Sequence, residues 1–229
     1  MSVVKVVRVL RKDNVDVCKM TEKSFRWGDY INDVFDDWVK NGVFLKAVEN
    51  DKIVGIIHVK VFKDFVWFEG LRVHKDYRRK GIGRLLTTKA MEISDGKTIR
   101  LLIHEHNKPS MALSTSLGFR QIDKIYYHSG REREFSKVVE TLKLKKVKVD
   151  LQKGYMDGWT WHPKEHYKNP VYSGIFRGKR IVALETKPLF LIEGSMGSMA
   201  YVSHNKDAGS GFIVFELDKS KHNVQNTKL

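Results

Sequence analysis

The sequence contains a single cysteine, Cys18, among its 229 residues. One cysteine cannot form a disulfide within the chain, and it cannot build a zinc site that depends on several thiolates. Cys18 falls in a segment with a helical pattern, where a free cysteine is more often a small buried residue than a nucleophile. We therefore expect neither a disulfide framework nor a bound metal.

Long apolar runs are missing as well. No segment approaches the roughly 18 consecutive apolar residues that a membrane-spanning helix needs. The first five residues, Met1 to Lys5, lack the apolar core and the small-residue cleavage site of a signal peptide. This pattern favours a cytoplasmic protein that does not insert into membranes.

Acidic residues are scarce, since 27 Asp and Glu stand against 42 Lys and Arg, for a formal net charge of +15. The excess is spread evenly: 24 basic residues face 16 acidic ones up to residue 130, and 18 face 11 after it. The densest basic cluster surrounds one glycine-bearing turn and comprises Arg72, Lys75, Arg78, Arg79, Lys80 and Arg84. A polyanionic ligand is expected to bind there.

Strand and helix patterns alternate through the first 130 residues. Strands are expected at 3–10, 44–48, 53–62, 66–73, 99–103 and 119–127, and helices from Asn14 toward Phe25, from Tyr30 to Gly42, after Gly83, and from Asn107 to Gly118. This alternation predicts the α/β class, with a mixed central sheet that is flanked by helices and complete by about residue 130.

The rest of the chain contains short strand patterns separated by glycine turns, after a helix expected within 132–142. We therefore expect two domains: an α/β domain at 1–130 and a smaller β-rich domain at 131–229. Nothing in the second segment indicates its role.

The turn from Arg78 to Arg84 has the features of an anion site. Gly81 and Gly83 let the backbone turn tightly where a helix begins, which exposes N–H groups at the positive end of the helix dipole. Such an end binds phosphates. The further glycine and distant acidic residue of a dinucleotide fingerprint are missing, and so is the Lys-Ser/Thr pair of a nucleotide P-loop. The remaining alternative is a solvated basic turn.

Arg78, Gly81 and Gly83 are spaced as Arg-x-x-Gly-x-Gly, which resembles the signature of the GNAT superfamily of acyl-CoA-dependent N-acetyltransferases. The resemblance continues through Leu71-Arg72-Val73 and Tyr77 upstream and through Asn107 and Leu117-Gly118-Phe119 downstream, and it covers about residues 3–127. The runs 28–38 and 69–73 resemble, more loosely, a branch that includes the histidine N-acetyltransferases, which also carry a C-terminal extension.

The resemblance implies that acetyl-CoA is the co-substrate and that its pantetheine arm lies between two parallel strands, ending near Val73 and Ile103, that splay apart. A backbone N–H near Val73 would polarise the thioester carbonyl. The cofactor contacts it implies come from Leu71, Arg72, Val73, Arg78, Arg79, Lys80, Gly81, Ile82, Gly83, Arg84 and Asn107.

Glu69 is the candidate catalytic base. A protonated amine has a pKa near ~10, so it needs a base before it can attack a thioester at neutral pH. Strict alternation places Glu69 on one strand face with Trp67, Leu71 and Val73, whose apolar surroundings would raise its pKa. A glutamate at the matching place is a proposed base in the related spermidine/spermine acetyltransferases. The alternative is an ordinary strand-end carboxylate, open to solvent or paired with Arg72 or Lys75.

Ser114 stands where the family often has a tyrosine that protonates the departing thiolate, and this is a departure from the pattern. Ser114 lies seven residues after Asn107 and therefore on the same helix face. It is a candidate proton donor or a contact to the cofactor sulfur. A thiol with a pKa near ~8.5 also leaves as the anion, so a strong acid is not obligatory.

The expected reaction is transfer of the acetyl group to a primary amine by direct attack in a ternary complex. The loose resemblance favours a free amino acid or small amine, with Trp27, Tyr30, Phe35 and Trp38 as candidate walls of its site. The alternatives are a macromolecular acceptor, such as a protein or an aminoacyl-tRNA, and a non-catalytic basic protein that senses acetyl-CoA or binds RNA. The oligomeric state, monomer or homodimer, stays open.

Overall fold

The structure, a computed structural model, describes residues 3–22, 24, 29–206 and 209–219. The chain forms two compact units. Unit 1 comprises Met1–Leu101, Leu113–Phe119 and Glu216–Leu229, and unit 2 comprises Leu102–Ala112 and Arg120–Phe215. None of the described helices combines the length and the apolar character that crossing a membrane requires.

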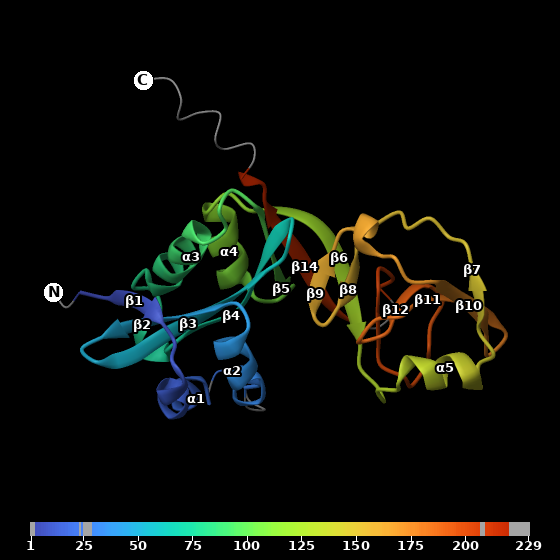
Figure 1. Ribbon diagram of the computed structural model, residues 1–229, viewed down its shortest axis with the longest axis horizontal. Helices are drawn as coiled ribbons and strands as arrows, with labels where there is room; N and C mark the ends of the chain where they lie inside the picture. Colours follow the sequence, from blue (N-terminus) through green and yellow to red (C-terminus); the bar gives the residue numbers. More distant parts are fainter. Residues whose placement is uncertain (1–2, 23, 25–28, 207–208, 220–229) are drawn as a thin grey trace, which may run out of the picture. The chain divides into compact units, whose positions relative to one another are not determined.

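Unit 1 is a sheet with helices on both faces (Figure 1). Its elements are β1 (Lys5–Arg8), α1 (Asn14–Thr21), α2 (Ile31–Lys40), β2 (Val43–Glu49), β3 (Lys52–Val61), β4 (Phe65–Val73), α3 (Ile82–Glu92), the start of β5 (Thr98–His104) and the end of α4 (Lys108–Ser116). The strand order is β1-β2-β3-β4-β5, antiparallel except for the parallel pair β4 and β5.

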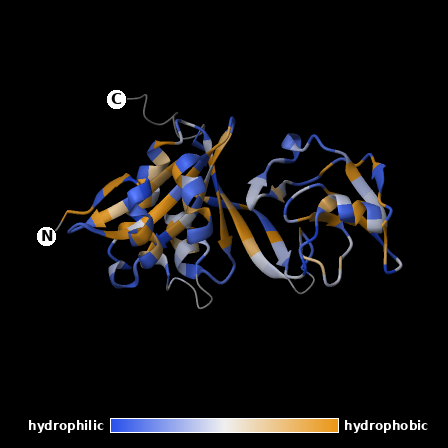
Figure 2. Ribbon diagram, turned by 60° about the horizontal axis from the view of Figure 1, so that its bottom comes forward, coloured by the Kyte–Doolittle hydropathy of each residue, from blue (hydrophilic) through white to orange (hydrophobic). Residues whose placement is uncertain are grey.

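The alternation along β3 decides which helices cover which face. Ile56 points into a core cluster with α1 and α2, whose other buried members are Val9, Val17, Ile31, Phe35, Trp38 and Phe44. The preceding residue, Gly55, faces α3, because a Cβ there would lie 2.9 Å from Leu86 and 3.1 Å from Ile82. Figure 2 shows these strands as an apolar layer between helices whose outer surfaces are largely hydrophilic.

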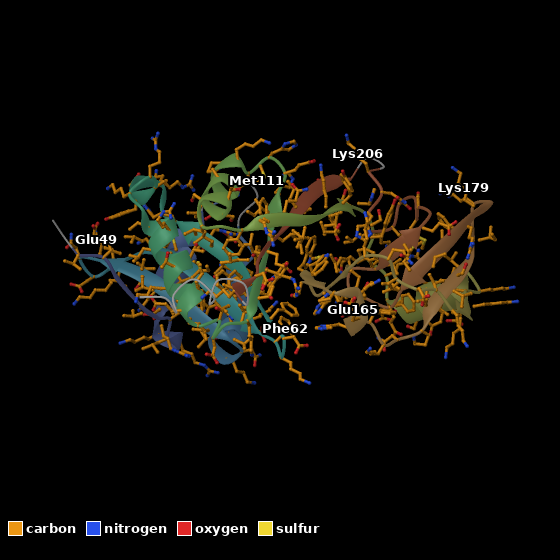
Figure 3. All side chains as sticks on the ribbon, turned by 90° about the horizontal axis from the view of Figure 1, so that it is seen from above. Glu49, Phe62, Met111, Glu165, Lys179 and Lys206 are labelled. Carbon is orange, nitrogen blue, oxygen red and sulfur yellow. The ribbon has the colours of Figure 1, made fainter. Side chains whose placement is uncertain are left out.

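The strands expected at 44–48 and 53–62 form an antiparallel hairpin, β2 and β3. Asn50 and Asp51 have φ angles of 47° and 60°. Positive φ at both central residues is the geometry of the two-residue turns that match strand twist. Figure 3 labels Glu49, the last residue of β2 before this turn, and Phe62, which follows β3.

β4 contains a bulge that the sequence-based prediction overlooked. In the pairing with β3, Arg72 lies opposite Ile56 and Glu69 lies opposite His58, so Gly70 and Leu71 together oppose one residue. Gly70 has φ +65°, the left-handed conformation that the first residue of such a bulge adopts. Directly opposed residues of an antiparallel pair share a face.

The expected grouping of Glu69 with Leu71 and Val73 is therefore wrong, because the extra residue reverses the alternation. Arg72 shares the face of Glu69, which is the side of α1 and α2. Val73 pairs with Gly55 and shares its face, the side of α3.

Unit 2 is mostly β-structure around its own apolar core. Its strand order is β14-β6-β13-β12-β11-β10-β7, with a separate hairpin of β8 and β9. The elements are β6 (Arg120–His128), α5 (Phe135–Thr141), β7 (Lys145–Val147), β8 (Tyr155–Asp157), β9 (Thr160–His162), β10 (Val171–Phe176), β11 (Lys179–Leu184), β12 (Phe190–Glu193), β13 (Tyr201–Ser203) and β14 (Ser210–Leu217). The buried core includes Val138, Leu144, Ile181, Leu191 and Tyr201.

The sheet is not complete at residue 130, contrary to expectation, because β14 also takes part in it. Within unit 1, Arg100 of β5 pairs with Glu216 of β14 at 2.8 Å. Within unit 2, the backbone N–H of Glu105 donates to the carbonyl oxygen of Gly211 at 2.9 Å. The α/β class and the β-rich region after residue 130 are confirmed, whereas a domain boundary at residue 130 stays a prediction.

Replacing Gly70 with alanine should destabilise unit 1 more than a φ penalty alone explains. A Cβ at Gly70 would lie 2.2 Å from the ring of Trp38, whereas one at Gly96, φ +76°, would meet nothing within 4 Å. We expect Gly96→Ala to cost about 1–2 kcal/mol from backbone strain. Gly70→Ala should cost about 1–3 kcal/mol more from overpacking. Urea unfolding of both variants measures the difference, and equal losses would contradict the assigned contact.

Candidate active site

The basic turn has the geometry of an anion site. Gly81 is the N-cap of α3 and has φ +80°, which a residue with a side chain adopts only at a cost. Arg79 also lies in the left-handed region, with φ +61°. Arg78, Lys80 and Arg84 are exposed. The turn thus presents the N–H groups of the first helical turn beside several cations.

Contacts within unit 1 hold the start of α3 in place. The side chain of Arg78 donates to the carbonyl oxygen of Val73 at 3.2 Å. The Arg84 guanidinium donates to Ser116 Oγ at 2.7 Å. A Cβ at Gly83 would lie 3.3 Å from Leu113, so α4 packs closely on the α3 terminus.

The parallel pairing of β4 and β5 ends before β4 does. It joins Phe65 through Phe68 to Thr98 through Leu101, and β4 continues to Val73. The expected divergence of the two strands concerns the residues beyond this point. The divergence was expected near Ile103 of β5, and this residue belongs to unit 2.

Glu69 is a partly buried carboxylate with two partners. Its side chain is 14% exposed. Oε1 lies 2.8 Å from His58 Nδ1, and Oε2 lies 3.1 Å from Lys60 Nζ. Both partners come from β3, on the face that carries Ile56. The apolar surroundings expected from strict alternation are thus replaced by a histidine and a lysine.

His58 is completely buried and both of its ring nitrogens are bonded. Nε2 lies 2.8 Å from the carbonyl oxygen of Asn41, at the end of α2. The ring stacks on Trp38 with a centroid distance of 4.5 Å and an interplanar angle of 7°. Phe44 meets the ring edge-on at 5.8 Å.

A second charged pair lies on the same side of the sheet. Arg72 Nε donates to Asp29 Oδ2 at 2.7 Å, and the Asp29 side chain is 1% exposed. The Arg72 guanidinium also lies 5.4 Å from the centroid of the Tyr30 ring. Desolvation raises the pKa of the Tyr30 hydroxyl, while Arg72 opposes that shift and Glu69 adds to it.

The remaining predicted site residues take distinct places. Ser114 is buried in the part of α4 that belongs to unit 1. Asn107 belongs to unit 2, where its side chain accepts a hydrogen bond from the Ser110 N–H at 3.2 Å and caps α4 as expected. Leu71 and Val73 are half-buried on β4. Trp27, a candidate wall, lies outside the described residues.

His58 and Lys60 were missed by the sequence-based prediction. Two signals were available. Polar residues at positions 58 and 60 interrupt an otherwise apolar strand on alternate residues, and a glycine follows Glu69 within the next strand, which is typical of a bulge.

Among the described residues, no group of three or more His, Cys, Asp or Glu side chains could hold a metal ion. The rings of His104 and His106 lie 5.3 Å apart.

The sequence profile of the acetyltransferase (GNAT) family matches residues 14–119. This span contains Glu69, His58, the basic turn and Ser114. No curated protein matches the sequence.

Two solved structures resemble nearly the whole chain. One is a "putative acetyltransferase" from Thermoplasma acidophilum, with 21% identity, a TM-score of 0.61, and coverage of 93% of this chain and 99% of that one. Another, a "putative acetyltransferase" from Pyrococcus horikoshii, has 16% identity, a TM-score of 0.56, and coverage of 94% and 89%. At these identities the likeness shows the fold, including the region after residue 130.

A third structure covers 53% of this chain and 92% of its own, with 18% identity and a TM-score of 0.45. It is the PaiA N-acetyltransferase from Thermoplasma acidophilum in complex with coenzyme A. The family match places the signature Arg-x-x-Gly-x-Gly at the start of α3 in a domain of known type. Residues 14–119 therefore form a domain of the acetyltransferase (GNAT) family.

Proposed function

We propose that the protein transfers the acetyl group of acetyl-CoA to a primary amine by direct attack in a ternary complex, with Glu69 as the base. The observation that carries this proposal is the bulge in β4. It places Glu69 on one face of the sheet and turns Val73 toward α3 on the other. One strand can thus serve two substrates that approach from opposite sides.

The turn at the start of α3 fits the pyrophosphate of acetyl-CoA. Its donors are the amides of Ile82, Gly83 and Arg84 and the exposed cations around them, a set suited to phosphate oxygens. A Cβ at Gly81 would meet nothing within 4 Å, so the turn is open on that side. Backbone groups of Leu71 to Val73 would hold the pantetheine arm. When bound, acetyl-CoA supplies the acetyl carbon, whose bond to sulfur breaks with the electron pair left on sulfur.

Glu69 takes the amine proton at Oε2. The N–H bond of the ammonium breaks, the proton moves to the carboxylate, and the nitrogen keeps the electron pair that forms the new N–C bond. Lys60, which bonds to Oε2, is 30% exposed. Its ammonium group can therefore turn toward solvent and leave Oε2 free to take the proton. Ser114, buried in α4 beside Leu113, is the candidate contact to the sulfur.

A free α-amino acid or a similarly small amine is the favoured acceptor. The face that carries Glu69 offers charges of both signs: Glu69 for an ammonium group, and Lys60, which is 30% exposed, for a carboxylate. A zwitterion satisfies both kinds of partner, whereas a simple polyamine satisfies only the acidic ones.

The test is release of free thiol from saturating acetyl-CoA with amino acids, their decarboxylated amines, polyamines and peptides. We expect turnover with amino acids and much weaker turnover with the decarboxylated amines. Turnover confined to peptides or aminoacyl-tRNA would contradict the small acceptor and leave the acetyl transfer intact. Binding of acetyl-CoA without turnover of any acceptor would contradict the catalytic proposal itself.

Glu69→Gln should lower kcat about 10²–10⁴-fold, because the amide keeps the shape of the side chain but cannot take a proton. Its affinity for acetyl-CoA should stay within about twofold, since Glu69 faces away from α3. Glu92→Gln, which removes an exposed carboxylate paired with Lys89, is the matched control and should retain full kcat. Steady-state thiol release measures kcat, and calorimetry measures the affinity.

Replacing Arg78 and Arg79 together with methionine should weaken acetyl-CoA binding at least tenfold. Each charge-assisted hydrogen bond to a phosphate is worth about 1.5–3 kcal/mol. Lys89→Met changes a cation at the opposite end of α3, where the dipole is negative, and should leave the affinity nearly unchanged. If the two variants bind acetyl-CoA equally well, the α3 terminus is not the pyrophosphate site.

A further inference from the structure

The hydrogen bonds of His58 fix where its protons lie. The carbonyl oxygen of Asn41 can only accept, so Nε2, which lies 2.8 Å away, carries a hydrogen and donates it. That leaves Nδ1 facing Glu69 Oε1 at 2.8 Å. When Glu69 is an ionised base, its oxygen is also only an acceptor. Nδ1 must then carry a hydrogen too, and His58 is an imidazolium.

The surroundings of the ring suit this charged, fixed state. The face of Trp38 lies parallel to the ring at a centroid distance of 4.5 Å, an arrangement that stabilises a cation over the indole. Two glycines leave space for the stacked rings of His58 and Trp38. A Cβ at Gly42 would lie 2.8 Å from His58 Nε2, and one at Gly70 would lie 2.2 Å from Trp38. The ring is held by hydrogen bonds at both nitrogens, by the stack on Trp38 and by the edge-on contact with Phe44.

We propose that His58 is a positioning residue for Glu69, a role that rests on the proposed function of Glu69 as the base. By donating from Nδ1 to Oε1, His58 fixes the rotation of the carboxylate and directs Oε2 toward the amine. Lys60 and Arg72 lie on the same side of the sheet, where Lys60 bonds to Oε2 and Arg72 bonds to Asp29. The bond from His58 to Oε1 orients the base from a buried, fixed ring.

Two variants separate the two hydrogen bonds of His58. In asparagine the amide nitrogen is attached to Cγ, as Nδ1 is in histidine, so His58→Asn can keep the bond to Glu69. In glutamine the amide nitrogen is one bond farther out, where histidine has Nε2, so His58→Gln can keep the bond to Asn41 and loses the one to Glu69. Both variants lose the stack on Trp38, so each controls for the packing change in the other.

We expect His58→Gln to lower kcat about 10–100-fold with little change in KM for either substrate, because a misdirected base costs rate rather than binding. His58→Asn should keep kcat within about threefold of the wild type. Equal losses in the two variants, in step with their loss of stability in urea, would overturn the proposal and leave His58 a packing residue.

Nitrogen-15 NMR of the ring nitrogens tests the same assignment without relying on turnover. The sequence has nine histidines, and the resonances of His58 are those absent from His58→Asn. We expect both nitrogens of His58 to be protonated in the wild type and only Nε2 to be protonated in Glu69→Gln, where no anion faces Nδ1. An Nδ1-protonated neutral ring, or a spectrum that Glu69→Gln leaves unchanged, would overturn the proposal.

The two proposals can fail separately. If the wild type turns over no amine, or Glu69→Gln turns over as fast as the wild type, the proposed function fails while the NMR result still reports on the His58 pair. If Glu69→Gln is inactive but His58→Gln keeps full kcat, the base stands and the positioning role falls.

Discussion

Because β4 bulges at Gly70 and Leu71, one strand presents Glu69 and Val73 to opposite faces of the sheet. Without the extra residue, positions four apart would share a face, and the base would point toward α3, where the cofactor is expected. The bulge requires a left-handed residue with no side chain, because Trp38 fills the space where a Cβ would stand. Glycine at position 70 therefore fixes both the path of the strand and the place of the indole.

The indole in turn organises the acceptor side. Trp38 stacks on His58, and His58 joins the end of α2 to Glu69 through its two nitrogens. Burial of a histidine costs little free energy when both ring nitrogens are hydrogen-bonded. Losing either partner destabilises the fold, because it leaves a desolvated polar group. On the other face, the left-handed conformation of Gly81 sets the turn into α3, and Gly83 lets α4 pack closely against the start of that helix. The two halves of the site meet at β3 and β4, which contribute residues to both faces.

Much of this could be predicted from sequence, for physical reasons that also explain the failures. The helix expected from Tyr30 to Gly42, the strands expected at 44–48 and 53–62 and the glycine-bearing helix start rest on local signals, and the structure confirms these elements. The role of His58 depends on contacts with positions 41 and 69, which lie far along the chain. The bulge was signalled by Gly70 within a strand, but a strict two-residue alternation misplaced Val73. The pairing of Arg100 with Glu216 is a long-range contact that no local pattern encodes.

The central claim is that amine and acetyl-CoA occupy opposite sides of β4 at the same time and that the acetyl group passes directly between them. Initial velocities measured while both concentrations are varied test this claim most directly, with the best acceptor from the thiol-release panel. Direct transfer predicts double-reciprocal lines that intersect, because neither product can leave before both substrates bind. Parallel lines would show that coenzyme A leaves before the amine binds, and they would contradict the account.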